Sequence, residues 1–332
     1  MKINQIMRLS LKICLFLLIT VIAIHFVVIL SNICIFIKKY FLLKQKNLAL
    51  SYGKNSWVVI TGGSSGQGKE FAIQLARAGF HILLIGSVRS YDVAKFIKET
   101  YNQKVIVIQK DFSESFQPSF FDEIETVIRD LDCSILINNV GYRTGWIPYH
   151  EQPPDEIRAS IACGTLVQAR MTHLLIPKFM KRKEQYRSSI VFITAQCMHP
   201  NLGLAVTLPN EISIPYMAVY EASNSFGYYH ACSIIKEYGT QSWLDVLNIT
   251  PGAVLTENTT QMLQSTPFAV KADTFVSNIL RFMGGNLNGT TCAYWGHSFS
   301  NGMIAFAPFM KDIILEKVGR QIATHCMQKR MK

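Results

Sequence analysis

Trp57-Val-Val-Ile60 runs directly into Thr61-Gly62-Gly63-Ser64-Ser65-Gly66-Gln67-Gly68-Lys69, and this junction decides the fold. The apolar run has the length of a buried strand, and the stretch from Gly66 to Ala78 has the period of an amphipathic helix. Glycines between a strand and a helix let the backbone turn tightly and approach a phosphate group at the positive end of the helix. The junction therefore predicts a strand–loop–helix unit that binds a phosphate.

The same alternation continues along the chain. Further apolar runs of strand length lie at 81–85, 105–108, 134–137, 189–193 and 244–249, and helix-like stretches separate them at 92–101, 120–130, 156–181 and 216–238. Short strands separated by helices predict βαβ units and a parallel sheet. The expected fold is α/β, with one Rossmann-like, doubly wound parallel sheet over 54–300. An apolar and basic segment, 301–332, is expected to pack on the domain or on a membrane.

Residues 1–53 are predicted to form a membrane anchor with a basic flank. Ile13 to Ile37 is a run of 25 residues without a formal charge, which as a helix is roughly 37 Å long and can cross the ~30 Å hydrocarbon layer. The run ends in bulky residues and then Lys38-Lys39, which favours an uncleaved transmembrane helix over a signal peptide. Five cations after the span, against three cations and the amino terminus before it, favour placement of the body on the cytosolic or matrix side. The organelle stays open between the mitochondrial inner membrane and the endoplasmic reticulum.

The charge is concentrated at the same end of the chain. The sequence has 33 Lys and Arg against 22 Asp and Glu, a net charge of +11, and nine of the cations lie in residues 1–69, before the first acid at Glu70. Nucleic-acid binding needs cations clustered on the folded surface, so it is not expected here. Membrane lipid and other membrane-protein subunits are the expected partners. The eight cysteines show no CxxC spacing, so no disulfide framework and no metal site are expected.

Three further motifs follow the phosphate loop in order: Asp111-Phe112, Asn138-Asn139-Val140-Gly141, and Pro251-Gly252 with Thr256. With the TGxxxGxG loop, they resemble the short-chain dehydrogenase/reductase family over 54–300. The anchor, Asn288-Gly289 and the run at 174–180 are similar to its membrane-bound branch of 17β-hydroxysteroid dehydrogenases and 3-oxoacyl-CoA reductases. The resemblance implies a dinucleotide site formed by Gly62, Ser64, Ser65, Gly66, Gly68, Arg89, Asp111, Asn139, Gly141, Pro251, Gly252 and Thr256.

Arg89 bears on the choice of cofactor. An acid at the end of the second strand would bind the ribose hydroxyls of NAD, whereas an arginine there accommodates the 2′-phosphate of NADP. Here Arg89 follows the strand, and the next acid is Asp92. If a dinucleotide binds, NADP(H) is therefore favoured. The alternative is that Arg89 is an ordinary surface cation.

The resemblance implies four catalytic groups, and three of them are replaced. Tyr220 stands at the position of the general acid, but Asn224 replaces the lysine four residues later, Ala195 the substrate-orienting serine and Gly164 the water-holding asparagine. The lysine matters because a neighbouring ammonium favours the tyrosine phenolate. Ala195 and Tyr220 are also 25 positions apart, about twice the spacing that the family implies, so residues 200–215 are expected to form an inserted loop over the site.

The main hypothesis from the sequence is a pseudoenzyme: a non-catalytic, membrane-anchored protein that binds NADP(H) at most and needs no small-molecule substrate. It would serve as an accessory or structural subunit of a membrane assembly, for which the mitochondrial inner membrane is a plausible location. The alternative is an NADPH-dependent 3-oxoacyl-CoA or 17β-hydroxysteroid reductase of the endoplasmic reticulum. A third hypothesis is a sensor that binds NADP(H) without chemistry. A replacement acid/base set also stays open, with candidates His199, Glu211, Glu221 and Cys197.

Overall fold

The computed structural model describes residues 2–142, 144–195, 215–257, 259–263, 266–285 and 287–306, together with Lys317, Arg320 and Thr324. The chain divides into two compact units, Met1–Lys44 and Gln45–Lys332. The predicted loop at 200–215 lies outside the described residues except for Pro215, as does most of the segment 301–332.

The first unit is a long helix, α1 (Lys2–Ile37), continued by the π-helical turn η1 (Lys38–Leu42). The most apolar 18-residue window within Leu11–Leu42 has a mean hydropathy of 3.1, and none of that window is buried against protein. Two polar groups of the span bond within the helix itself: the Thr20 hydroxyl donates to the Phe16 carbonyl and the His25 ring to the Val21 carbonyl, both at 2.8 Å. This helix is long and apolar enough to span a membrane.

The second unit alternates helices and strands. Its first half consists of α2 (Leu48–Tyr52), β1 (Trp57–Thr61), α3 (Gly66–Arg77), β2 (His81–Gly86), α4 (Ser90–Tyr101), β3 (Val105–Gln109), η2 (Phe112–Glu114), η3 (Pro118–Phe121), α5 (Asp122–Arg129) and β4 (Cys133–Asn138). Its second half consists of η4 (Tyr149–Glu151), α6 (Pro154–Ile161), η5 (Ala162–Val167), α7 (Gln168–Lys181), β5 (Ser188–Ile193), α8 (Ala218–Tyr238), β6 (Leu244–Ile249), β7 (Val254–Leu255), α9 (Thr260–Leu263), β8 (Val270–Lys271), α10 (Ala272–Phe282), β9 (Gly289–Thr291) and α11 (Trp295–Phe306).

Seven of these strands form one parallel sheet in the order β3-β2-β1-β4-β5-β6-β9. The predicted doubly wound sheet is thus confirmed. The three-residue strand β9 was not predicted, because Gly289–Thr291 contains no apolar run. The strand order reverses between β1 and β4, and in such sheets ligands bind beyond the carboxyl ends of the strands at this switch point.

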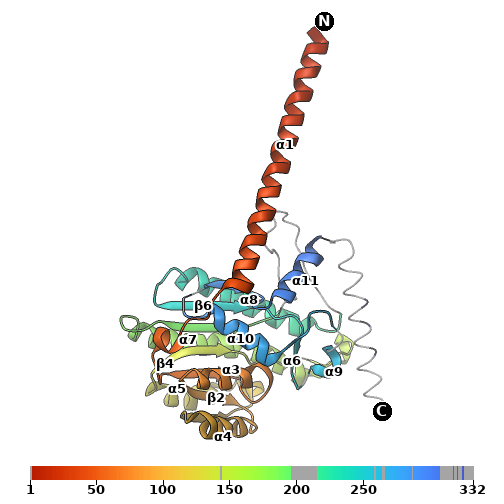
Figure 1. Cartoon of the computed structure of the whole chain (residues 1–332). Coiled ribbons are helices and arrows are strands. Elements are labelled where there is room, and N and C mark those ends of the chain that lie inside the picture. Colours follow the sequence, from red (N-terminus) through yellow and green to blue (C-terminus); the bar gives the residue numbers. More distant parts are fainter. Residues whose placement is uncertain are drawn as a thin grey trace. The chain divides into compact units, whose positions relative to one another are not determined.

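Helices pack on both faces of the parallel sheet (Figure 1). Side chains of alternating strand positions, among them Val59, Leu83 and Leu136, pack with residues of α5, α7 and α8 in one apolar cluster. Helix α3 contacts α4, α10 and the strands β1 and β2, and α4 contacts β2 and β3. Near-continuous apolar strands are what a parallel sheet covered on both sides requires.

Helix α2 belongs to the second unit, although the sequence groups it with the anchor. Tyr52 is fully buried, and its hydroxyl donates to Asp245 Oδ2 at 2.6 Å while accepting from the Gly284 amide at 2.6 Å. Arg187 forms an ion pair with the same, fully buried Asp245 carboxylate. Burial, and then the charge of Asp245, raises the pKa of Tyr52, so its hydroxyl stays protonated and donates. The structure therefore divides the chain after Lys44, not after Gly53.

Candidate active site

The phosphate loop between β1 and α3 needs its glycines for close packing. Gly62 and Gly66 have φ of +71° and +53°, in the left-handed region. A Cβ at Gly68 would lie 2.2 Å from the Gly62 carbonyl oxygen, which no real Cβ tolerates. The first turn of α3 can therefore pack directly against the loop only when position 68 has no side chain.

The end of α3 at this loop fits a phosphate. Ser65 is the N-cap residue of the helix, and its side chain makes no capping hydrogen bond. The first amide groups of a helix need an acceptor, and an anion supplies one at the positive end of the helix dipole. With the tight turn at Gly62 and Gly68, this arrangement fits the pyrophosphate of a dinucleotide.

Asn139 joins the end of β4 to the phosphate loop. Its Nδ2 donates to the carbonyl oxygens of Thr61 and Gly62, both at 3.1 Å. In return, Thr61 Oγ1 accepts from the backbone amides of Asn139 and Val140, at 3.1 and 3.2 Å. Thr61 and Asn139 are 78 positions apart in the sequence, and their bonds join the two motifs in one hydrogen-bonded unit at the switch point of the sheet.

A cavity of about 760 Å³, the outer cavity, adjoins the phosphate loop. It gathers the predicted cofactor residues Gly62, Ser64, Ser65, Arg89, Asp111, Asn139 and Gly141. Lys110 also lines it, and its ammonium lies 2.9 Å from Glu123. Asp111 Oδ1 accepts from the Ser113 amide at 3.0 Å and thereby begins η2. Two cations on this wall fit the phosphate of an adenosine 2′-phosphate; the sequence motifs indicated Arg89 but not Lys110.

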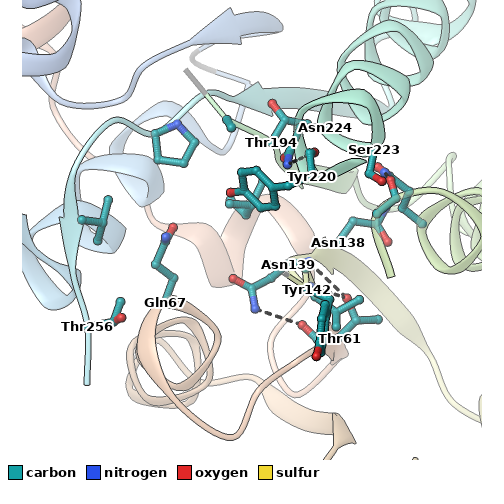
Figure 2. Close-up of a pocket in the computed structure, with 18 of the residues that line it drawn as sticks. Thr61, Gln67, Asn138, Asn139, Tyr142, Thr194, Tyr220, Ser223, Asn224 and Thr256 are labelled. Atoms are coloured by element: carbon teal, nitrogen blue, oxygen red, sulfur yellow. Dashed lines mark hydrogen bonds between the residues drawn. The ribbon is translucent and has the colours of Figure 1, made fainter. Parts of the chain in front are cut away.

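A second cavity of about 480 Å³, the inner cavity, shares Asn139, Val140, Gly141 and Tyr142 with the outer one. It gathers all four predicted catalytic positions, Gly164, Ala195, Tyr220 and Asn224, and the predicted cofactor residues Pro251, Gly252 and Thr256. Figure 2 shows the Tyr220 ring projecting into this space, with Gln67 and Asn139 on the wall across from α8. No described residue of its lining carries a formal charge.

Other residues of the inner cavity were missed by the sequence. Gln67, Asn138 and Gln168 bring three carboxamides to its lining. Asn138 is 5% exposed, and its Nδ2 donates to Thr172 Oγ1 at 3.0 Å. Gln67 lies inside the phosphate-loop motif, at a position where the motif specifies no residue. Asn138 begins the motif Asn138-Asn139-Val140-Gly141, from which only Asn139 and Gly141 were assigned to the site. These amides make the cavity neutral but rich in hydrogen-bonding groups.

Asn224 does not take over the role of a cation beside Tyr220. Its Nδ2 donates to the Tyr220 backbone carbonyl at 2.9 Å, within one turn of α8. At the end of β5, Ala195 offers no hydroxyl. The neighbouring Thr194 uses its hydroxyl toward β6, at 3.0 Å from Asn248 Oδ1 and 3.1 Å from the Ile249 carbonyl. Tyr220 is thus the one acid among the four predicted positions.

The glycine at position 164 is tied to the packing of α8. A Cβ at Gly164 would lie 2.6 Å from Ser223 Cβ, so η5 and α8 are in contact at this point. An asparagine could not occupy position 164 without moving α8. The loss of this family residue is therefore coupled to a change in helix packing, which the sequence motif alone did not indicate.

The described part of the chain offers few other proton carriers near the two cavities. Burial raises the pKa of the Cys163 thiol, on the wall of the outer cavity, to about 12, so it stays protonated and unreactive. Burial, and then Glu156, raises the pKa of Tyr142 on the shared wall. Glu221 is buried and is not a lining residue of either cavity. The remaining candidates for a replacement acid/base set, His199, Glu211 and Cys197, lie outside the described residues.

The sequence is similar to a known family and to characterised proteins. The family model for short chain dehydrogenase matches residues 56–266. The chain is 29% identical over 292 residues to the very-long-chain 3-oxoacyl-CoA reductase of Aspergillus clavatus, covering 85% of this chain and 77% of that one. It is 27% identical over 275 residues to human 17-beta-hydroxysteroid dehydrogenase type 3, covering 81% and 80%.

Solved structures share the fold. A 7beta-hydroxysteroid dehydrogenase matches with a TM-score of 0.66 at 20% identity, over 83% of this chain and 99% of that one. A short-chain dehydrogenase from Sphingobium yanoikuyae in complex with NADPH matches with a TM-score of 0.59 at 22% identity, over 77% and 96%. At these identities the likeness concerns the arrangement of the sheet and helices.

Proposed function

The chain belongs to the short-chain dehydrogenase family, and from this membership we propose that it is a membrane-anchored, NADPH-dependent reductase of a 3-oxoacyl-CoA or a ketosteroid. One observation carries the proposal: Tyr220 lines a neutral cavity that adjoins, through four shared residues, the outer cavity with Arg89 and the phosphate loop. This is the alternative to the main hypothesis from the sequence. Relatives named as reductases and dehydrogenases favour it over the non-catalytic subunit.

Each of the two cavities would hold a different half of the cofactor. The first turn of α3 would hold the pyrophosphate, and Arg89 with Lys110 would face the 2′-phosphate. The fold neighbour solved with NADPH supports the choice of cofactor. Bound NADPH would supply a hydride to a carbonyl carbon. Since the outer cavity takes the adenosine half, the substrate carbonyl belongs in the inner cavity beside Tyr220.

Tyr220 is the proton donor of this proposal. Reduction of a ketone adds one hydride to carbon and one proton to oxygen, and the Tyr220 hydroxyl gives that proton and regains one from solvent. A tyrosine hydroxyl has an ordinary pKa near 10, well below that of an alcohol, so transfer to the developing alkoxide is downhill without a lysine. The reverse reaction needs the phenolate as a base. The site thus favours reduction over oxidation.

The replaced groups set the expected rate. Loss of one acid/base partner typically costs about 10² to 10⁴ in rate, and losses within one unit do not multiply. Ala195 and Asn224 therefore predict slow turnover. They also favour a second candidate function, an NADP(H)-binding subunit of a membrane assembly without chemistry.

We place the reductase in the endoplasmic reticulum membrane with its body in the cytosol, where an anchor brings the site to membrane-soluble ketones.

The test uses the full chain in detergent or nanodiscs. NADPH consumption is measured with a 3-oxoacyl-CoA and, separately, with a ketosteroid, for the wild type and for Tyr220→Phe. The reductase predicts slow, substrate-dependent consumption that Tyr220→Phe abolishes. Binding of NADPH without turnover would select the second candidate, and no binding of NADPH would contradict both.

A further inference from the structure

A buried histidine holds the loop that leaves β6. His297, in the first turn of α11, is 2% exposed. Its Nδ1 lies 3.2 Å from the Gly252 amide, and its Nε2 lies 3.3 Å from the Ala253 carbonyl oxygen. The amide can only donate and the carbonyl can only accept, so these partners assign the neutral tautomer with its proton on Nε2. The imidazole thus bonds to the backbone of two consecutive residues, Gly252 and Ala253.

The surroundings of the ring keep this tautomer in place. Phe275 of α10 and Tyr294 pack against it, with ring centroids 5.6 and 5.1 Å away. Burial lowers the pKa of His297 to about 4, so the ring is neutral at physiological pH. A neutral ring is required here, because a protonated Nδ1 could not accept from the Gly252 amide.

Helix α11 is itself fixed to the ends of two strands. Asn301, one turn beyond the histidine, donates from Nδ2 to Cys292 Sγ at 3.4 Å, and Thr250 Oγ1 lies 3.5 Å from the same sulfur. The Thr250 amide donates to the Thr291 carbonyl at 3.0 Å. The helix that carries the histidine is therefore bonded to Cys292, directly after β9, which in turn lies against Thr250, directly after β6.

The loop faces the reacting end of the cofactor site. Pro251 and Gly252 line the inner cavity together with Tyr220, whereas His297 is not among its lining residues. If the outer cavity takes the adenosine half, the nicotinamide half must lie in the inner cavity, where Tyr220 protonates the carbonyl that receives the hydride. The backbone of Pro251 and Gly252 is then a wall against which the nicotinamide half rests.

Resting on the proposed function, we propose that His297 is a positioning residue, which fixes the backbone at Gly252 and Ala253 against the nicotinamide half of NADPH without contacting the cofactor. Two hydrogen bonds of ordinary strength are at stake. Their loss is expected to weaken binding of whole NADPH about 10-fold. Binding of adenosine 2′,5′-bisphosphate, which has no nicotinamide half, should change by less than about 2-fold.

The test compares these two ligands by fluorescence titration of the full chain. His297→Phe keeps a ring in the pocket but removes both hydrogen bonds, and His297→Gln keeps one donor and one acceptor. The matched control is His230→Phe, a half-buried histidine of α8 that packs on Phe192 and whose ring does not bond to the loop. The proposal predicts a selective loss of NADPH affinity in His297→Phe, a smaller loss in His297→Gln, and no change in the control.

Two results would overturn the inference, and a third would contradict the proposed function. Equal weakening of both ligands in the two His297 variants would show a general structural role. Unchanged NADPH affinity in His297→Phe, or in His297→Gln if the first variant does not fold, would show that the loop needs no histidine. Failure of the wild type to bind either ligand would instead contradict the proposed function from which the inference starts.

Discussion

Replacing Asn224 with lysine returns a cation to a cavity whose described lining has no formal charge. Asn224 lines this cavity one helical turn after Tyr220, and its amide now bonds to the Tyr220 backbone carbonyl. An ammonium about 5 Å from the phenol oxygen, at an effective dielectric constant near 20, favours the phenolate by about 3 kcal/mol relative to the wild type. That energy raises the ratio of phenolate to phenol about 100-fold. The lost amide bond costs only about 1 kcal/mol of stability.

Alcohol oxidation is the informative assay, because it needs the phenolate as a base. The pH–rate profile of NADP-dependent oxidation of a 3-hydroxyacyl-CoA should move to lower pH in Asn224→Lys. At pH 7, where the phenolate is a minor form in both proteins, the rate should rise about 100-fold, in line with the calculated energy. Adding Ala195→Ser should raise it further. The uncharged control Asn224→Gln should behave as the wild type. Equal profiles for Asn224→Lys and Asn224→Gln would refute the reasoning that the missing charge limits this site.

Four further predictions concern the cofactor site and the fold. Gly68→Ala places a Cβ 2.2 Å from a backbone oxygen and should abolish NADPH binding. A Cβ at Gly141 has no heavy atom within 4 Å, so the control Gly141→Ala should preserve the fold. NADPH titration and thermal unfolding of both variants check this. Arg89→Ser should weaken NADPH binding by about 10- to 100-fold and leave NADH unchanged. Asp245→Asn should lower the free energy of unfolding by about 3 kcal/mol, measured in denaturant, because its arginine partner loses a fully buried counter-charge. The pKa of His297 is lowered from 6.5 to about 4, so the unfolded chain binds one proton more between these pH values; stability should therefore fall by up to about 3 kcal/mol as the pH drops from 6.5 to 4, and His297→Gln should remove this dependence.

Local sequence patterns were sufficient to predict most of the fold. The strand–loop–helix junction at Thr61 and the apolar runs that follow predicted the parallel sheet, because strands buried on both faces show as short apolar segments. Strand β9 was missed because Gly289–Thr291 pairs with β6 through the backbone and carries no apolar pattern. Helix α2 was grouped with the anchor because its burial depends on Tyr52 bonding to Asp245, 193 residues further along.

The candidate site was predictable only where a motif carried it. The spacing of Tyr220 and Asn224 revealed the missing lysine directly, since both lie on one helix. Gln168 and His297 belong to no motif. The fold brings Gln168 into the lining of the inner cavity, and it brings His297 into contact with the Gly252 backbone behind that lining. The contact between Gly164 and Ser223 likewise depends on how two helices pack. The motifs showed which catalytic groups are absent, whereas the activity that a single remaining acid can support depends on the cavity around Tyr220.

Transfer of deuterium from 4,4-dideuterated NADPH tests the central claim most directly. The full chain is incubated with the labelled cofactor and a 3-oxoacyl-CoA, and the 3-hydroxyacyl product is analysed by mass spectrometry. The account predicts slow formation of product with one deuterium at the reduced carbon, and its loss in Tyr220→Phe. Absence of labelled product from protein that binds NADPH, or equal labelling by Tyr220→Phe, would contradict it.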